Sequence, residues 1–350
     1  MSLGDDIKAA GEESLIRLRR ERDSARNELA KLQAEFERTS MALEFVEQAE
    51  GAAIEPPKWM SPAKAKAGAA TLVLALSDMH FDEVVNPDEV DGLNAYNRKI
   101  AELRLQKWAQ NVVKLSRDYL AGVKYDGIVL ALMGDTFSGD IHEELAQTNA
   151  DTSLGSLLHW SEQIAAAVDL LSRDVAGRVH VVATPGNHGR TTRKPRAKLR
   201  ARTNLDWLLA KMVERHFAGN DKITFTIPEG ADAWVSIYGQ GHLFTHGDQV
   251  NGGGGIGGIY PPIMRLRARK VQRYMAMGSS MSTLWLGHWH QYLPSPGLVV
   301  NGSVKGYDEY AFINNFQFEP PQQALAVVVP EKGITFQAPV FCQDRKREGW

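Results

Sequence analysis

Three apolar runs separated by helical stretches are the feature that most restricts the folds open to this chain. The runs are "ATLVLALSD", "GIVLALMGD" and "GRVHVVATPGN", and residues 98–121 and 155–174 between them are expected to be helical. Strands that alternate with helices form a buried sheet with helices on its faces. Later runs, such as "AWVSIYGQGHLFTHGD" and "ALAVVVPEKGITFQAPV", are linked by turns and predict hairpins. We therefore expect an α/β fold.

A different pattern occupies residues 1–50. Apolar residues recur at alternating steps of three and four from Leu15 to Val46, with mostly charged and amide side chains between them. This repeat predicts a coiled-coil helix, because only such a period keeps the apolar seam facing a partner helix. We expect residues 15–46 to form a homo-oligomer, and an amphipathic helix docked on its own domain is the alternative.

The composition changes again after this helix. Prolines, small residues and the absence of a period predict a linker over residues 51–69. Residues 70–342 are then expected to form the main domain, and residues 343–350 a tail.

Cysteine content and hydropathy limit the class of protein. The single cysteine, Cys342, excludes an internal disulfide and any cysteine-built zinc site, and it fits a reducing compartment. No apolar run is long enough to span a bilayer, and the polar N-terminus does not have the pattern of a secretory signal. We expect a soluble cytoplasmic protein without a membrane partner.

Polar residues gather where five of the apolar runs end. In open sheets flanked by helices, ligands bind where loops leave the strand ends, so side chains from separate strands are expected to converge there. The clusters are "SDMHFD", "GDTFSGD", "PGNHG", "THGD" and "GHWH", with the candidate residues Asp78, His80, Asp135, Asn187, His188, His246, His288 and His290.

The residue types in these clusters suit metal ions. Side chains two apart leave an extended chain on the same side, so Asp78 and His80 are expected to point together, as are His288 and His290. Carboxylate, amide oxygen and imidazole nitrogen suit divalent ions such as manganese, iron or zinc. One carboxylate can bridge two ions that lie about 3.5–4 Å apart. A single cluster is as compatible with ordinary packing, and the conjunction of all five favours a metal site.

In the order and residue types of these five clusters, the chain resembles the calcineurin-like metallophosphoesterases from about residue 71 to about residue 305. The resemblance implies two stacked mixed sheets flanked by helices, in four layers, with two divalent metal ions at the sheet edge. Manganese is the expected ion, with iron, zinc, nickel or cobalt as alternatives. The implied ligands are Asp78, His80 and His290 for the first ion, Asn187, His246 and His288 for the second, and Asp135 for both.

The resemblance also implies a phosphoesterase reaction. Two cations lower the pKa of a bridging water and neutralise phosphate oxygens during in-line attack. His188 matches the family's catalytic histidine, which protonates the leaving oxygen or stabilises its charge. Nucleases of the SbcD type commonly have Asp where this chain has Gly189. Asp82 and Asp248 are therefore candidates for orienting the site residues.

Two details argue against a protein phosphatase. Protein serine/threonine phosphatases have Asp-Arg-Gly in the second cluster and Glu after Gly-Asn-His. Here "GDTFSGD" has no Arg, and Gly189 follows His188.

A basic segment directly follows the third cluster. Residues 190–202, "RTTRKPRAKLRAR", hold seven Lys or Arg and no acid in a chain of net charge −2. Cations grouped in this way bind a polyanionic backbone, and a solvated surface is the alternative. Arg265, Arg269 and Arg273 repeat every four residues along one expected helical face. The candidate substrate-binding residues are His142, Arg190, Arg193, Lys194 and Arg196.

Three functions remain open. The favoured one is a metal-dependent phosphodiesterase that cleaves nucleic acid, DNA or RNA, and so resembles the SbcD-type nucleases. The second is a phosphatase or phosphodiesterase acting on nucleotides or other small molecules. The third is a non-catalytic scaffold, which is disfavoured because every implied ligand position is filled.

Overall fold

The computed structural model describes residues 19, 22–24, 26–27, 30, 57–60, 69–252 and 258–350. The chain divides into two units, Met1–Ala53 and Ile54–Trp350. Most of the predicted coiled coil (15–46), most of the predicted linker and residues 253–257 lie outside the described residues. Within the described residues, no helix is long and apolar enough to cross a membrane.

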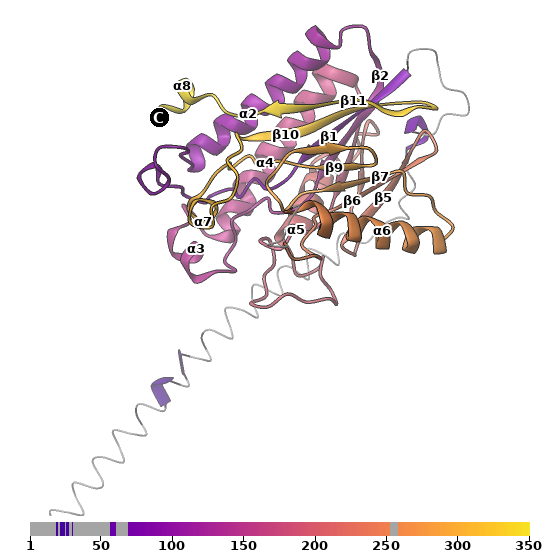
Figure 1. The fold of residues 1–350 in the computed structure, drawn as a ribbon. Coiled ribbons are helices and arrows are strands. Elements are labelled where there is room, and N and C mark those ends of the chain that lie inside the picture. Colours follow the sequence, from indigo (N-terminus) through magenta and orange to yellow (C-terminus); the bar gives the residue numbers. More distant parts are fainter. Residues whose placement is uncertain are drawn as a thin grey trace, which may run out of the picture. The chain divides into compact units, whose positions relative to one another are not determined.

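The first sheet contains six strands in the order β11-β10-β1-β2-β3-β4 (Figure 1). β1 to β4 run parallel, while β10 and β11 are antiparallel to their neighbours. β1 is buried along its whole length, which explains its unbroken apolar sequence. The strands are β1 (Ala69–Leu76), β2 (Lys124–Leu132), β3 (Val179–Ala183), β4 (Ile223–Thr226), β10 (Gln322–Val329) and β11 (Gly333–Phe341).

The second sheet contains five strands in the order β5-β6-β7-β9-β8. β6, β7 and β9 are parallel, and the edge strands β5 and β8 are antiparallel to their neighbours. Along β5, buried and half-buried residues alternate, as expected for a strand with one face in the core. The strands are β5 (Asp232–Ile237), β6 (Gln240–Thr245), β7 (Thr283–Leu286), β8 (Leu293–Ser295) and β9 (Leu298–Val300).

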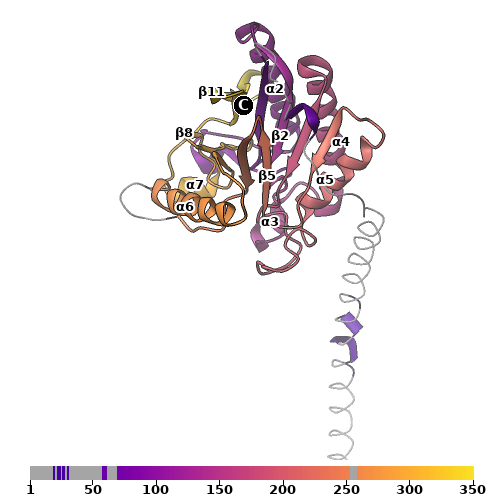
Figure 2. The same ribbon diagram turned by 90° about the vertical axis from the view of Figure 1, so that its right-hand side faces the viewer.

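The two sheets stack face to face over one apolar core. Side chains from both sheets share this core, among them Val73, Val129, Val182, Val235, Phe244 and Trp285. On the outer face of the second sheet, Ile263 and Leu266 of α6 pack against Leu284 and Val300. Helices α4 and α5 lie on the opposite side of the molecule from α6 (Figure 2). The predicted fold of two stacked mixed sheets flanked by helices is confirmed.

The two helices predicted between the first three strands are present, with caps that explain where they begin. Asn97 accepts a hydrogen bond from the backbone N–H of Ile100 at the start of α2, and Thr152 accepts one from Gly155 at the start of α4. The longer helices are α2 (Arg98–Lys114), α4 (Ser153–Leu171), α5 (Leu205–His216) and α6 (Tyr260–Ala276). The short helical segments are η1 (Lys58–Met60), η2 (Pro87–Val90), η3 (Leu115–Tyr119), η4 (Ser172–Ala176), α3 (Glu143–Thr148), α7 (Glu309–Ile313) and α8 (Arg345–Glu348).

Two segments that the sequence places outside the main domain pack onto it. Within the predicted linker, Met60 is 0% exposed in the core between the sheets. Within the predicted tail, Glu348 of α8 is 1% exposed and pairs with Arg104 at 3.0 Å. The predicted tail is therefore joined to the main domain through the Arg104–Glu348 ion pair.

Two buried histidines are held in the neutral form. His180 on β3 lies with its Nδ1 2.8 Å from the Thr224 hydroxyl and its Nε2 2.9 Å from the Thr226 hydroxyl. The Nδ1 of His242 accepts a hydrogen bond from Trp285 Nε1 at 3.1 Å. Burial lowers the pKa of each imidazole from 6.5 to about 4.

These shifts predict a loss of stability in acid. Both side chains are neutral in the folded protein near pH 5, whereas the unfolded chain protonates them below about pH 6.5. The contribution of these histidines to the free energy of unfolding is therefore fully present above pH 6.5. It is lost as the pH drops towards 4, by up to about 3 kcal/mol per histidine. Urea denaturation of wild type and of the His180→Gln variant at pH 7.5, 6.0 and 5.0 measures this. The free energy of unfolding of the variant should depend less steeply on pH, by the equivalent of about one proton. An unchanged pH dependence would contradict the assignment.

Candidate metal centre

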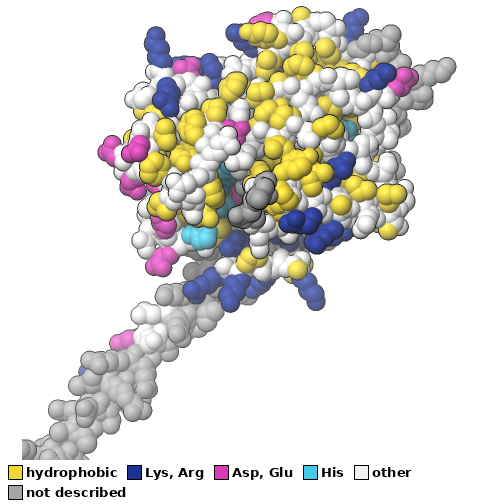
Figure 3. Space-filling view, viewed as in Figure 1, with side chains coloured by type: hydrophobic (Ala, Val, Ile, Leu, Met, Phe, Trp, Pro, Cys, Tyr) yellow, Lys and Arg dark blue, Asp and Glu magenta, His cyan; other side chains and the backbone are white. Residues whose placement is uncertain are grey.

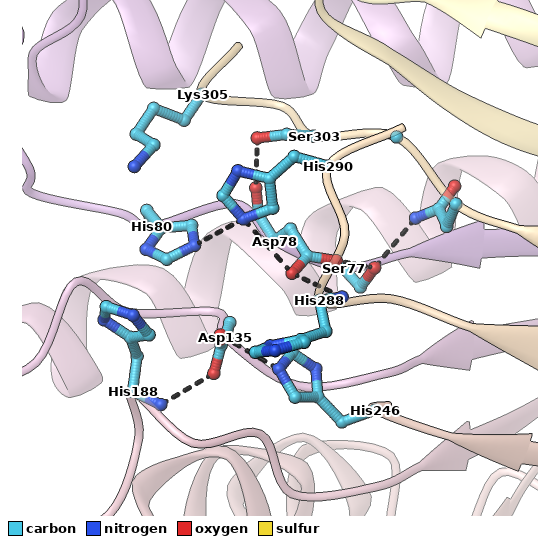
Figure 4. A network of polar contacts seen from close by, with 12 residues as sticks. Ser77, Asp78, His80, Asp135, His188, His246, His288, His290, Ser303 and Lys305 are labelled. Atoms are coloured by element: carbon cyan, nitrogen blue, oxygen red, sulfur yellow. Dashed lines mark hydrogen bonds and ion pairs between the residues drawn. The ribbon is translucent and has the colours of Figure 1, made fainter. Parts of the chain in front are cut away.

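The loops that follow five parallel strands meet at one edge of the stacked sheets (Figure 4). β1, β2 and β3 of the first sheet and β6 and β7 of the second all end there. Three groups of side chains offer ligand atoms within 4.8 Å of one another: first Asp78, His80 and His290; second Asp135, His246 and His288; and third His80, Asp135 and His188. The convergence expected from the strand ends is therefore present.

The backbone of these residues differs from the expected extended form. Asp78, His80, Asp135, His288 and His290 all have positive φ, between 46° and 70°. The expectation that residues 78–80 and 288–290 are extended is wrong. Asp and His tolerate the left-handed region better than most residues, and each such position costs on the order of 1 kcal/mol. These turns place neighbouring ligands: His290 faces Asp78, whereas the ring of His288 lies 5.1 Å from that of His246.

The first group consists of one carboxylate and two imidazoles. His290 Nε2 lies 3.4 Å from Asp78 Oδ1 and 3.1 Å from His80 Nε2. Asp78 is completely buried, and its carboxylate accepts hydrogen bonds from Ser77 Oγ at 2.5 Å and from the backbone N–H of His288 at 2.8 Å. This donor set fits a borderline divalent ion.

The second group is centred on His246. Its Nδ1 donates to the Met133 carbonyl at 2.7 Å, which directs Nε2 into the site. That Nε2 lies 3.0 Å from Asp135 Oδ2 and 3.0 Å from Asn187 Oδ1. Asp135 and His80 each belong to two of the three groups, so the groups adjoin one another.

The electrostatics of the site favour cation binding. Burial lowers the pKa of His80 and of His288 to about 4, so both are neutral. Burial opposes ionisation of Asp135, but His246 and His188 hold its pKa well below 3.8. Burial also opposes protonation of His246, but Asp135 raises its pKa to about 10. Carboxylates and neutral imidazoles are the forms that bind metal, and a cation at His246 replaces a proton.

The imidazole ring of His188 is held by a backbone carbonyl, whereas its own backbone N–H is bound to a carboxylate. Its Nδ1 donates to the Ser138 carbonyl at 2.8 Å, and its backbone N–H donates to Asp135 Oδ1 at 2.7 Å. The ring lies 4.5 Å from that of His80. Because Nδ1 is bound to the Ser138 carbonyl, Nε2 is the ring nitrogen that remains available to a ligand.

The two acids expected to orient the site residues have other partners. Asp82 accepts hydrogen bonds from Arg98 Nε at 2.5 Å and from Trp160 Nε1 at 3.0 Å. Asp248 accepts two from Arg200, both at 2.8 Å. Neither contacts His188, because the Ser138 carbonyl occupies its Nδ1.

Two carboxylates that support the candidate ligands were not predicted from the sequence. Glu83 Oε2 lies 3.3 Å from His80 Nδ1, and Glu83 Oε1 accepts from the buried Lys305 at 2.8 Å. Asp206 is buried and accepts from the backbone N–H groups of Thr136 at 3.0 Å and Gly186 at 2.9 Å. Glu83 follows His80 by three residues, but Asp206 in the first turn of α5 resembles an ordinary helix-start acid.

The residues predicted to bind substrate differ in their burial and in their contacts with the centre. The His142 ring lies 6.1 Å from that of His188. Arg190 is half-buried and donates to the Asn187 carbonyl at 2.8 Å. Arg193, Lys194 and Arg196 are exposed.

Basic side chains gather along the lower edge of the face in Figure 3, over α6 and the segment 190–202. On α6, Arg265 and Arg269 are exposed, whereas Arg273 lies 3.5 Å from Asp232. The predicted basic patches are thus at the surface, on the same face as a hollow in which histidine side chains are visible.

Comparison with known proteins gives only distant likeness. No protein-family model matches the chain, and no curated protein matches it. Among solved structures, wild-type Vps29 from Entamoeba histolytica complexed with Zn²⁺ is 13% identical over 78% of this chain and 99% of its own, with a TM-score of 0.28. The sulfate thiohydrolase SoxB from Thermus thermophilus is 12% identical over 83% of this chain and 57% of its own, with a TM-score of 0.32. These values are too low to assign a function, which must be inferred from the site itself.

Proposed function

We propose that this chain is a phosphodiesterase of the calcineurin-like metallophosphoesterase type that uses two divalent metal ions to cleave nucleic acid. The observation that carries the proposal is the position of Asp135. Its carboxylate lies 3.0 Å from His246, and its ligand atoms lie within 4.8 Å of those of His80 on one side and of His246 and His288 on the other. The four-layer fold and the buried, mixed oxygen and nitrogen donor set support the same assignment.

Each residue of the centre has a role in this proposal. One carboxylate and two imidazoles would hold the first ion, an amide and two imidazoles would hold the second, and Asp135 would be available to both. When bound, the ions lower the pKa of a water and neutralise phosphate charge. The residues are Asp78, His80 and His290 for the first site, and Asn187, His246 and His288 for the second. Manganese is the expected ion, and zinc, iron, nickel and cobalt suit the same donors.

His188 handles the leaving group. Because Nδ1–H is fixed on the Ser138 carbonyl, the imidazolium form presents its second proton on Nε2. From there it donates the proton to the leaving oxygen. The buried His80 ring beside it fixes the ring plane.

Replacing His188 tests this role. The His188→Asn variant should retain its metal content and lose about 10²–10⁴-fold in kcat on bis(p-nitrophenyl) phosphate with manganese. His159→Asn, which changes a histidine paired with Glu102 away from the centre, is the matched control. Loss of bound metal by His188→Asn, measured by elemental analysis, would instead make His188 a ligand.

The substrate class is tested with polymers and small esters. Arg193, Lys194 and Arg196 support a nucleic-acid substrate because they are exposed and make no ion pair with any residue that the structure describes. We expect cleavage of DNA or RNA, and binding that weakens steeply with added salt. Turnover of a phosphomonoester with DNA and RNA intact would favour a small-molecule phosphatase, and metal binding without any turnover would favour a scaffold.

We also propose that residues 15–46 join copies of the chain and so bring several centres to one polymer. Light scattering of the full chain and of a variant with Leu29→Asp and Leu32→Asp measures this. A mass per particle that is the same for both would contradict the proposal.

A further inference from the structure

A small pocket adjoins the metal centre on the side of the second ligand group. Asn187, Arg190, Thr192, Arg196, Arg200 and Asp248 are among its lining residues. Asn187 belongs to both features, because its side-chain oxygen lies 3.0 Å from His246 Nε2. A group bound in the pocket is therefore separated from the centre by a single residue.

The loop that forms the pocket is closed at its base. The backbone N–H of Thr191 donates to the Thr203 carbonyl at 2.9 Å, and that of Leu205 donates to the Gly189 carbonyl at 2.7 Å. Arg190 leaves this base with its Nη1 on the Asn187 carbonyl at 2.8 Å and its Nε on the Thr192 carbonyl at 3.2 Å. The pocket wall is thus fixed to the backbone of a proposed metal ligand.

The pocket carries an excess of positive charge. It is lined by three guanidinium groups and one carboxylate, Asp248, which is bound by Arg200. The two hydrogen-bond partners of Arg190 are neutral carbonyl oxygens, and Arg190 makes no ion pair with any residue that the structure describes. Arg196 is exposed and makes no ion pair within the described part of the chain. Arg200 Nε is buried and has no hydrogen-bond acceptor among the described residues.

Planar guanidinium groups with free donors match the oxygens of a phosphate group. Arginines that served only to keep the loop soluble would point outwards, whereas Arg190 is half-buried and Arg200 has only 19% of its side chain exposed.

We propose that this pocket binds the phosphate adjacent to the one being cleaved, so that the enzyme selects a nucleotide chain over an isolated phosphoester. The proposal rests on the proposed function, because it assigns the substrate class of the same centre. Arg190 and Arg196 bind the neighbouring phosphate. The other basic residues at the loop tip contact phosphates further along the nucleic-acid backbone; they are Arg193, Lys194 and Lys198. The chemistry recognised is a second phosphate one nucleoside away.

A pair of chromogenic esters isolates this effect. Thymidine 5′-(p-nitrophenyl phosphate) and its 3′-phosphorylated form share the scissile bond and differ by one phosphate. We expect manganese-loaded wild type to prefer the second by at least about tenfold in kcat/KM, and Arg190→Gln and Arg196→Ala each to reduce this ratio by about tenfold, as for one lost hydrogen bond to a charged group. Arg117→Ala, at a surface ion pair with Asp174, should leave the ratio unchanged.

The outcomes separate the pocket from the proposed function. A ratio near one with both esters cleaved overturns the pocket and leaves the phosphodiesterase standing, whereas no cleavage of either ester by metal-loaded protein overturns the proposed function. If the ratio of the two kcat/KM values is unchanged in both arginine variants, the proposed role of the pocket is also wrong. A third ester, with the second phosphate as a diester to another thymidine, identifies the source. If the diester and the terminal phosphate raise kcat/KM equally, the pocket recognises a nucleotide chain. If only the terminal phosphate raises kcat/KM, the proposal of a nucleotide chain is overturned.

Discussion

Asp135→Asn is expected to reduce kcat/KM on phosphodiesters by at least about 10²-fold and to lower the metal content. Residues that only support a metal ligand cost about 10–100-fold when replaced, and a shared ligand should cost more. Asp135 is 1% exposed, and its oxygens contact His246 Nε2 at 3.0 Å and the backbone N–H of His188 at 2.7 Å. Asparagine keeps the shape of the side chain and removes its charge, so the loss measures how much the proposed metal binding depends on that charge.

Elemental analysis and steady-state kinetics measure this result together. Asp174→Asn is the matched control, because it makes the same change at a surface ion pair with Arg117. Far-ultraviolet circular dichroism verifies that both variants fold. An Asp135→Asn variant with full metal content and wild-type kcat/KM would end the assignment of Asp135 as the shared ligand.

Glu348→Gln is expected to lower the free energy of unfolding by about 3–5 kcal/mol, because it leaves a buried guanidinium without its counter-charge. Arg104 is 0% exposed, and besides Glu348 it donates to the carbonyls of Val304 at 3.1 Å and Lys305. α8 thereby anchors the segment that carries Lys305, whose ammonium group contacts Glu83 behind His80.

Urea denaturation gives the unfolding free energies. Glu144→Gln, which makes the same change at an exposed position of α3, should alter stability by less than about 0.5 kcal/mol. The double variant Arg104→Met with Glu348→Leu should be less damaging than the sum of its single changes, because it leaves no unpaired charge. Additive losses, or a Glu348→Gln effect no larger than that of Glu144→Gln, would contradict a buried ion pair.

Several parts of the fold could be predicted from local pattern. The apolar runs identify β1, β2 and β3, and the stretches between them identify α2 and α4. Because such strands end at one edge of a sheet, the Asp, Asn and His residues that follow them could be named as candidate ligands. The structure brings these side chains together at hydrogen-bond distances.

The conformation at the ligands was not predictable in the same way. Alternation along a strand gives the face on which a side chain lies only while the chain stays extended, and Asp78 and His80 lie past the end of β1 with positive φ. Turns of this kind depend on what surrounds them. Gly134, for example, approaches Gly186 so closely that a Cβ atom there would lie 2.3 Å from its backbone nitrogen.

Residue type and order determined the strands, the helices that cover them and the candidate donors of the metal centre, because burial and hydrogen bonding act on short stretches of chain. Which donors face one another was decided only when the two sheets packed together, bringing His80 within 3.1 Å of a histidine 210 positions away. The same packing recruited Glu83, Lys305, Asp206 and the Arg104–Glu348 pair. These contacts join distant parts of the chain, so no local pattern predicts them, although Glu83 also lies only three residues after His80.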